Sequence, residues 1–115
     1  MLSLSSRDQI YLCTGHVDFR MQIKGLIKTT QRIIQENPYS GSYFIFTNRK
    51  KTAVKILHYD GQGYWMHLKM LSTGKFFWPK EEEGKIEMSP QQLQVLLMQG
   101  DPLSTSFQES WRKVA

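Results

Sequence analysis

The sequence predicts an α+β fold in which one long amphipathic helix packs on an antiparallel β-meander, with a second helix near the carboxy terminus. Two observations support this prediction. Apolar residues between positions 19 and 34 recur with the period of a helix, whereas the runs at 43–46, 53–59 and 64–71 are β-type and separated by turn residues. The chain has 115 residues, enough for one modest core, so we expect a single domain over residues 1–115.

The first expected elements are a short strand and the long helix. Residues 9–13 form an apolar run that ends at a Thr-Gly turn. Asp18 then stands where a helix N-cap is expected, because its carboxylate can accept the free amide hydrogens of a first turn. Asn37-Pro38 ends this helix. Its core stripe, about 120° wide, is predicted to contain Phe19, Ile23, Leu26, Ile27, Thr30, Ile33 and Ile34.

The last two β-type runs are expected to form a hairpin. They are joined by Asp60-Gly61-Gln62-Gly63, and glycine supplies the positive φ angles of tight turns at no steric cost. Symmetrical closure of this hairpin would place Tyr59 opposite Tyr64 and Leu57 opposite Met66.

The carboxy-terminal part contains a short strand and a helix. Residues 85–88 predict the strand, which follows an acidic, solvated loop at 81–83. Ser89-Pro90 opens the helix, with Ser as the N-cap and Pro at the first helical position, and Gly100 ends it. The last residues, 103–115, are expected to form a further short helix.

Positive charge is concentrated in the middle of the chain. Between positions 20 and 80 there are eleven cations and only two anions, whereas the net charge of the whole chain is +5. Such a block, interleaved with aromatic residues, is typical of a surface that meets a polyanion. The alternative interpretation is that these cations only keep a helix face and a turn soluble. The candidate phosphate contacts are Arg20, Lys24, Lys28, Arg32, Arg49, Lys50, Lys51 and Lys55.

The aromatic residues of this block have two interpretations. Most of them alternate along the β-type runs, as core residues of a small domain do. Stacking platforms for single-stranded bases use the same residue types on open sheets. Tyr59, Tyr64 and Trp65 cluster around the Gly-rich turn, and they are therefore the candidate partner-binding residues.

We expect no enzyme activity, because no catalytic constellation is visible. Metal-dependent phosphoryl chemistry needs convergent carboxylates, but Asp18 is explained by helix capping, Asp60 by turn formation and the glutamates at 81–83 by solvation. His58 and His67 could share a sheet face, yet a transition-metal site needs three or four ligands. The sequence therefore predicts no catalytic residue, no metal and no cofactor.

The compartment is inferred from three features. Cys13 is the only cysteine, which excludes an internal disulfide and a cysteine metal cluster. No apolar run approaches the roughly 20 residues that cross a bilayer. The amino terminus lacks the apolar core of a secretion signal. We expect a cytoplasmic protein without a membrane partner.

Most of the chain, from about residue 9 to residue 101, resembles the TnpB accessory-protein family of IS-sixty-six-type bacterial insertion sequences, which is unrelated to the RNA-guided nuclease of the same name. The resemblance in the first half rests on Asp18-Phe19-Arg20, Gly25-Leu26, Pro38-Tyr39-Ser40-Gly41, Tyr43-Phe44-Ile45-Phe46 and Asn48-Arg49. In the second half it rests on Val54-Lys55-Ile56-Leu57, Tyr59-Asp60-Gly61-Gln62-Gly63, Lys69-Met70-Leu71 and Gly74-Lys75-Phe76-Phe77-Trp78-Pro79. In this family an arginine tends to follow the lysine at position 69, where this chain has Met70, so Lys69 is the only candidate phosphate contact in that strand.

This resemblance implies participation in transposition beside a larger transposase that carries the catalytic residues. The family has no assigned active site, and nothing is carried over to the tail at 102–115. The leading hypothesis is a non-catalytic accessory protein that binds DNA, either transposon ends or non-specific duplex. The alternative is a subunit that bridges or recruits the element's transposase without direct DNA contact.

Overall fold

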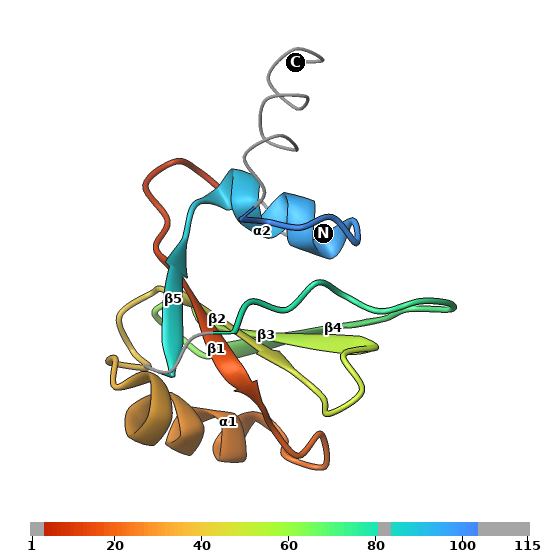
Figure 1. The fold of residues 1–115 in the computed structure, drawn as a ribbon. Coiled ribbons are helices and arrows are strands. Elements are labelled where there is room, and N and C mark those ends of the chain that lie inside the picture. Colours follow the sequence, from red (N-terminus) through yellow and green to blue (C-terminus); the bar gives the residue numbers. More distant parts are fainter. Residues whose placement is uncertain (1–3, 81–83, 104–115) are drawn as a thin grey trace.

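The computed structural model describes residues 4–80 and 84–103, which form a five-stranded sheet with a helical layer on each face (Figure 1). The expected acidic loop at 81–83 and residues 104–115 of the expected terminal helix lie outside the described residues. In chain order the elements are β1 (Ile10–His16), α1 (Ile23–Thr29), the π-helical turn η1 (Thr30–Ile34), β2 (Tyr43–Thr47), β3 (Ala53–Tyr59), β4 (Tyr64–Met70), β5 (Lys85–Met88) and α2 (Pro90–Leu97). None of the helices in this part of the chain is long and apolar enough to cross a membrane.

The sheet is mixed, which corrects the expected antiparallel meander. Its strand order is β4-β3-β2-β1-β5. β1 runs parallel to β2, with Ile10 opposite Tyr43, whereas the other neighbouring pairs are antiparallel. Parallel neighbours require a crossover connection, and α1 with η1 provides it. β1 also continues through Thr14-Gly15, where a turn was expected, with an irregular register between Leu12 and His16.

The β3–β4 hairpin has the predicted register, with Tyr59 opposite Tyr64 and Leu57 opposite Met66. Asp60 closes the turn, because its Oδ1 accepts hydrogen bonds from the backbone amides of Gln62 at 2.8 Å and Gly63 at 2.9 Å. Residues close together in the sequence therefore determine this part of the sheet.

The long helix begins later than expected, and Asp18 is not its N-cap. α1 begins at Ile23 with Gln22 in the N-cap position. The Asp18 carboxylate instead accepts hydrogen bonds from the backbone amide and guanidinium of Arg20. The ammonium of Lys55 donates to the backbone carbonyls of Phe19 and Met21, two residues that precede the helix.

The second half of the helix is widened. After seven α-helical residues the chain forms a five-residue π-helical turn, closed by a 2.8 Å hydrogen bond from the amide of Gln35 to the carbonyl of Thr30. Leu26, Thr30 and Ile34 are fully buried, but Ile33 is 48% exposed. Placing Ile33 in the core stripe was therefore wrong, because a π-helical turn changes the phase of the residues that follow it.

Two hydrophobic clusters lie on opposite faces of the sheet. Leu26 and Ile34 pack with Phe44 and Phe46 on the α1 face, whereas the α2 face is filled by Leu93, Leu96 and residues such as Phe76 and Trp78. β2, in the middle of the sheet, is buried along its whole length. The sheet is therefore packed on both faces, and the loops leave it at the ends of the strands.

The predicted start of α2 is confirmed. Ser89 Oγ accepts a hydrogen bond from the amide of Gln92 at 3.1 Å, and Gln92 Oε1 accepts one from the amide of Ser89 at 2.9 Å, which is a capping box. The helix ends at Leu97, three residues before the expected Gly100. Gln99, with φ of +64°, is the residue that adopts the left-handed conformation.

Candidate nucleic-acid-binding groove

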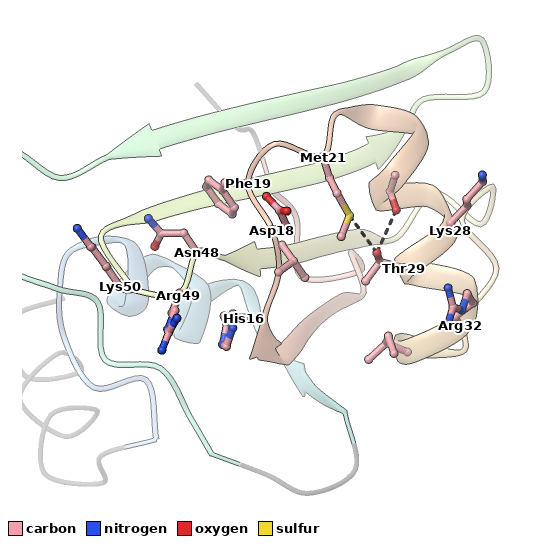
Figure 2. Close-up of a pocket in the computed structure, with 13 residues that line it drawn as sticks. His16, Asp18, Phe19, Met21, Lys28, Thr29, Arg32, Asn48, Arg49 and Lys50 are labelled. Carbon is pink, nitrogen blue, oxygen red and sulfur yellow. Dashed lines mark hydrogen bonds between the residues drawn. The ribbon is translucent and has the colours of Figure 1, made fainter.

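An open groove of about 860 Å³ lies between α1, the loop after β1 and the tip of the β2–β3 hairpin. We call it the basic groove because four cations line it: Lys28, Arg32, Arg49 and Lys50. Figure 2 shows Lys28 and Arg32 on the helical side and Arg49 and Lys50 on the hairpin side. Apolar side chains of Val17, Phe19, Met21 and Ile33 also line the groove.

The helix provides two of these cations. Lys28 and Arg32 are four residues apart, so they lie about one turn from each other on the same side of the helix, and both are exposed. Lys24 is also exposed but does not line the groove. The structure thus brings together two of the four cations predicted on the helix face.

Arg20 lies before α1 rather than on it. Its Nη2 is 2.6 Å from Asp18 Oδ2, and its side chain is 91% exposed. The hydrogen bonds from the side chain and backbone of Arg20 lower the pKa of Asp18 to about 2. Asp18 is therefore charged at neutral pH, and Arg20 offsets the only negative charge that the described residues bring to the groove.

The hairpin tip has a fixed backbone. Asn48 Oδ1 accepts a 2.9 Å hydrogen bond from the amide of Thr52, and Asn48 Nδ2 donates to Thr52 Oγ1 at 3.0 Å. Lys51 completes the turn with φ of +59°, and its side chain does not line the groove. Arg49 and Lys50 occupy the tip itself, and both are exposed.

Lys55 is buried, and Lys69 lies outside the basic groove. Lys55 is only 4% exposed, and its Nζ donates to the carbonyl oxygens of Phe19 at 3.0 Å and Met21 at 2.7 Å. The ammonium also lies over the Phe19 ring, 4.8 Å from the centroid. Lys69 lies on another part of the sheet, where its Nζ donates to the carbonyl of Leu97 at 2.6 Å. Lys55 thus holds the wall of the basic groove.

Tyr59 and Tyr64 belong to an aromatic cluster with a third member that was not predicted. Tyr39 joins them, with ring centroids 5.1 Å from Tyr59 and 5.6 Å from Tyr64, and it is 58% exposed. Burial raises the pKa of Tyr64 to about 12, and the neighbouring tyrosines add to the effect. The sequence feature that could have identified Tyr39 is its position directly after Asn37-Pro38, in the turn that ends the helix.

Trp65 is separate from this tyrosine cluster. Successive residues of a strand point to opposite faces, so Trp65 lies on the face opposite Tyr64. Trp65 is 57% exposed, and its Nε1 donates to Asp60 Oδ2 at 2.7 Å. The tyrosine cluster lies at the Tyr59 end of β3, whereas the basic hairpin tip precedes the Ala53 end. The two candidate surfaces are therefore far enough apart to be changed independently.

The two sheet histidines make other contacts. His58 stacks on Tyr43 with a centroid distance of 3.9 Å, and His67 stacks on Trp65 at 6.2 Å. Within residues 4–80 and 84–103, no group of three or more histidine, cysteine, aspartate and glutamate side chains could hold a metal ion.

Comparison with known proteins gives a family match over most of the chain. A model of the IS66 Orf2-like protein family matches residues 8–106. Two similar proteins come from Sinorhizobium fredii (strain NBRC 101917 / NGR234), both described as uncharacterized. The protein y4hO is 36% identical over 112 residues, which cover 97% of this chain and 96% of y4hO. The protein y4jC is 30% identical over 97 residues, which cover 84% of this chain and 83% of y4jC. No solved structure matches.

Proposed function

Because the chain belongs to the IS66 Orf2-like family, we propose that it is a non-catalytic accessory protein of DNA transposition and that it binds DNA through the basic groove. The family supports the accessory role in transposition. The charges and positions of the residues that line the groove support DNA binding.

One observation carries this proposal: cations from two separate segments line the same groove. Lys28 and Arg32 come from the helix, and Arg49 and Lys50 come from a hairpin tip that follows β2. Among the residues that the structure describes, Asp18 is the only anion that lines the groove, and it is paired with Arg20. Two pairs of cations on opposite sides of one groove suit a phosphate backbone that lies between them.

The two kinds of cation have different roles in this proposal. A guanidinium can donate two parallel hydrogen bonds to one phosphate, so Arg32 and Arg49 position the backbone. Lys28 and Lys50 act as point charges that release counterions when they meet phosphate. Contacts of this kind do not read base sequence. The protein therefore holds DNA for a separate transposase, and no bond-breaking step is assigned to its own residues.

The tyrosine cluster supports a second candidate function, which is direct contact with the transposase. Tyr39 exposes 58% of its surface although its ring contacts two other tyrosines. Exposed aromatic anchors contribute a large share of the binding energy in protein interfaces. This candidate needs no DNA, so it and DNA binding can be tested separately.

Charge-neutralising variants test the groove. Arg49→Gln combined with Lys50→Gln removes two groove cations without changing the core. We expect weaker binding to fluorescent duplex DNA of any sequence, and a salt dependence whose slope falls by about one for each lost phosphate contact. Lys24→Gln combined with Lys75→Gln is the matched control, because both lysines are exposed and neither lines the groove.

Equal loss of affinity in the two double variants would contradict the proposed groove, since it would show that only total charge matters. A transposase pull-down with Tyr39→Ala tests the second candidate. If Tyr39→Ala no longer retains the transposase in the pull-down but binds DNA with unchanged affinity, the tyrosine cluster is part of the interface with the transposase.

A further inference from the structure

The two edge strands of the sheet differ in how they are protected from further pairing. β5 and β4 lie at opposite ends of the sheet (Figure 1). β5 has only four residues, two of them the charged Lys85 and Glu87, and Lys85 forms an ion pair with Glu36. β4 has seven residues, pairs continuously with β3, and contains no proline or glycine. Short length, charge, bulges and proline are the usual protections of edges, and β4 has one charged residue, Lys69.

The ladder fixes which backbone groups of β4 point away from the sheet. Hydrogen bonds from the amide of Asp60 to the carbonyl of Gly63 and from the amide of Leu71 to the carbonyl of Thr52 lie at its two ends. Hydrogen-bonded and non-hydrogen-bonded pairs alternate between these ends. The backbone amide and carbonyl groups of residues 65, 67 and 69 therefore point inward, toward β3. The outward positions are Tyr64, Met66, Leu68 and Met70, and their amide and carbonyl groups have no partner strand among the described residues.

Apolar side chains are exposed on both faces of this edge. Leu68 is 53% exposed and Met70 is 71% exposed on the α1 face, whereas Trp65 is 57% exposed on the α2 face. An unpaired edge with exposed apolar side chains is a template for another strand.

We propose that β4 pairs with β4 of a second copy of this chain, antiparallel about a two-fold axis at His67, so that the two sheets become one continuous sheet. The outward positions of the two copies then form four pairs. Residue 64 of each copy pairs with residue 70 of the other, and residue 66 of each copy pairs with residue 68 of the other. Each hydrogen-bonded pair exchanges two N–H···O bonds. No other register uses all four outward positions of both strands.

The side chains are self-complementary in this register. On the α1 face Met66 meets Leu68 of the second copy, and Tyr64 meets Met70 of the second copy, so each apolar group finds an apolar partner. On the α2 face Trp65 lies opposite Lys69 of the second copy, in a non-hydrogen-bonded pair where side chains are closest. A lysine over an indole is a favourable contact. The Lys69 ammonium donates to Leu97 and retains two further donors.

A shift of the register removes these contacts. If the second copy is shifted by one residue, each outward amide and carbonyl of β4 lies opposite a residue whose own backbone groups already bond to β3. Shifting by two residues leaves an outward position at one end of each strand unpaired, and it separates Trp65 from Lys69. The pattern of β4 therefore favours a second copy of the same strand, because one patch supplies both sides of a two-fold interface.

The two-fold axis of such a pair is perpendicular to the sheet, so the α1 faces of both copies lie on the same side. The basic grooves would then face the same side of the dimer. The dimer itself does not depend on DNA binding, and its test uses the protein alone.

The mass of the full chain in solution tests the proposal, by light scattering or sedimentation. We expect twice the mass of one chain at micromolar concentration. Leu68→Pro should give the single-chain mass, because it removes only an outward-pointing amide and proline is tolerated at such edge positions. Leu68→Lys should do the same by charge repulsion and desolvation, which keeps the test valid if the proline variant does not fold. Phe77→Lys is the matched control, since Phe77 is 57% exposed and lies outside β4.

A cross-link tests the register. His67→Cys places two thiols in a non-hydrogen-bonded pair, about 4.5 Å apart at Cα, within the range that a disulfide spans. We expect a covalent dimer after mild oxidation. Trp65→Cys should not link to itself, because its two copies are roughly 13 Å apart along the strands. The native Cys13 is 2% exposed, so the wild-type chain is the control for its reactivity.

Three results would overturn the homodimer. The first is a wild-type chain that has the mass of one copy. The second is a dimer that persists in folded Leu68→Pro and Leu68→Lys variants. The third is a chain that is monomeric alone but loses the transposase in the Leu68→Pro variant, which would assign the β4 edge to the transposase.

Discussion

At the scale of single residues, Lys55 shows how a cation can belong to the structure rather than to a binding surface. Its ammonium has no carboxylate partner among residues 4–80 and 84–103, and it is satisfied by the carbonyls of Phe19 and Met21 and by the Phe19 ring. Removing a buried donor leaves its acceptors unpaired, which is more costly than losing an exposed bond. The loop that forms one wall of the basic groove is held by this side chain.

Replacing Lys55 by methionine keeps most of the side-chain volume but removes the donor. We expect the free energy of unfolding to fall by about 1–3 kcal/mol, measured by urea denaturation. Lys50→Met, at an exposed position, should change it by no more than roughly 0.5 kcal/mol. A Lys55→Met protein as stable as the wild type would show that the two carbonyls find other donors.

Asp60 gives a prediction for acid stability. Hydrogen bonds from the amides of Gly63 and Gln62 and from the Trp65 indole lower its pKa from 3.8 to about 2. A carboxyl whose pKa is lower in the folded state stabilises it above the unfolded pKa, and this contribution is lost as pH falls toward the folded value. Near pH 6 the wild type should therefore have a higher melting temperature than Asp60→Asn. The difference between the two melting temperatures should become smaller as pH falls from about 4 toward 2. A melting-temperature difference that does not change with pH would mean that the charge of the Asp60 carboxylate does not stabilise the hairpin.

At the scale of elements, the π-helical turn decides which residues of the helix reach the sheet. Leu26, Thr30 and Ile34 are four residues apart and fully buried. Thr30 Oγ1 also donates to the carbonyl of Leu26 at 2.8 Å, so its hydroxyl is satisfied inside the core. Ile33 is left to line the basic groove.

Alanine substitutions distinguish the two kinds of position in this helix. Leu26→Ala should lower the free energy of unfolding by about 2–5 kcal/mol, because it leaves a cavity in the core. Ile33→Ala should cost at most about 1 kcal/mol, since the side chain is already half exposed. Thermal or urea unfolding gives both values. Equal losses would indicate a regular α-helix with Ile33 in the core.

At the scale of the whole molecule, the basic groove lies apart from the tyrosine cluster and from the β4 edge, which have Tyr64 in common. The basic groove lies beside the β2–β3 tip, the tyrosine cluster lies at the other end of β3, and the unpaired edge of β4 forms one side of the sheet. Because the groove shares no residue with the other two surfaces, the proposed DNA contact does not compete with either proposed protein contact.

The salt dependence of DNA binding reports on the whole charged surface. If the four cations of the basic groove each neutralise one phosphate, the logarithm of affinity should fall with the logarithm of salt concentration with a slope of roughly 3 to 4 per protomer. Fluorescence titrations of random duplex DNA at several salt concentrations measure this slope. Absence of binding at low salt would remove the DNA hypothesis and favour transposase contact through the tyrosine cluster.

Features that depend on neighbouring residues could be predicted from the sequence. The turn residues from Asp60 to Gly63 determined the hairpin register, and Ser89 with Gln92 determined the start of α2. Both depend on hydrogen bonds within a few residues. The family and the positive block could also be recognised from the order of residues alone.

Features that depend on distant segments were decided only by the tertiary structure. The direction of β1 beside β2, the burial of Lys55 and the exposure of Ile33 each depend on what packs against that residue or strand. The basic groove is of the same kind, because the helix and the hairpin tip meet only after the sheet has formed. The sequence by itself thus determined local conformation and charge, whereas the folded chain decided which charges share a surface. The reason is physical: local hydrogen bonds need only neighbouring residues, but burial and convergence need the whole path of the chain.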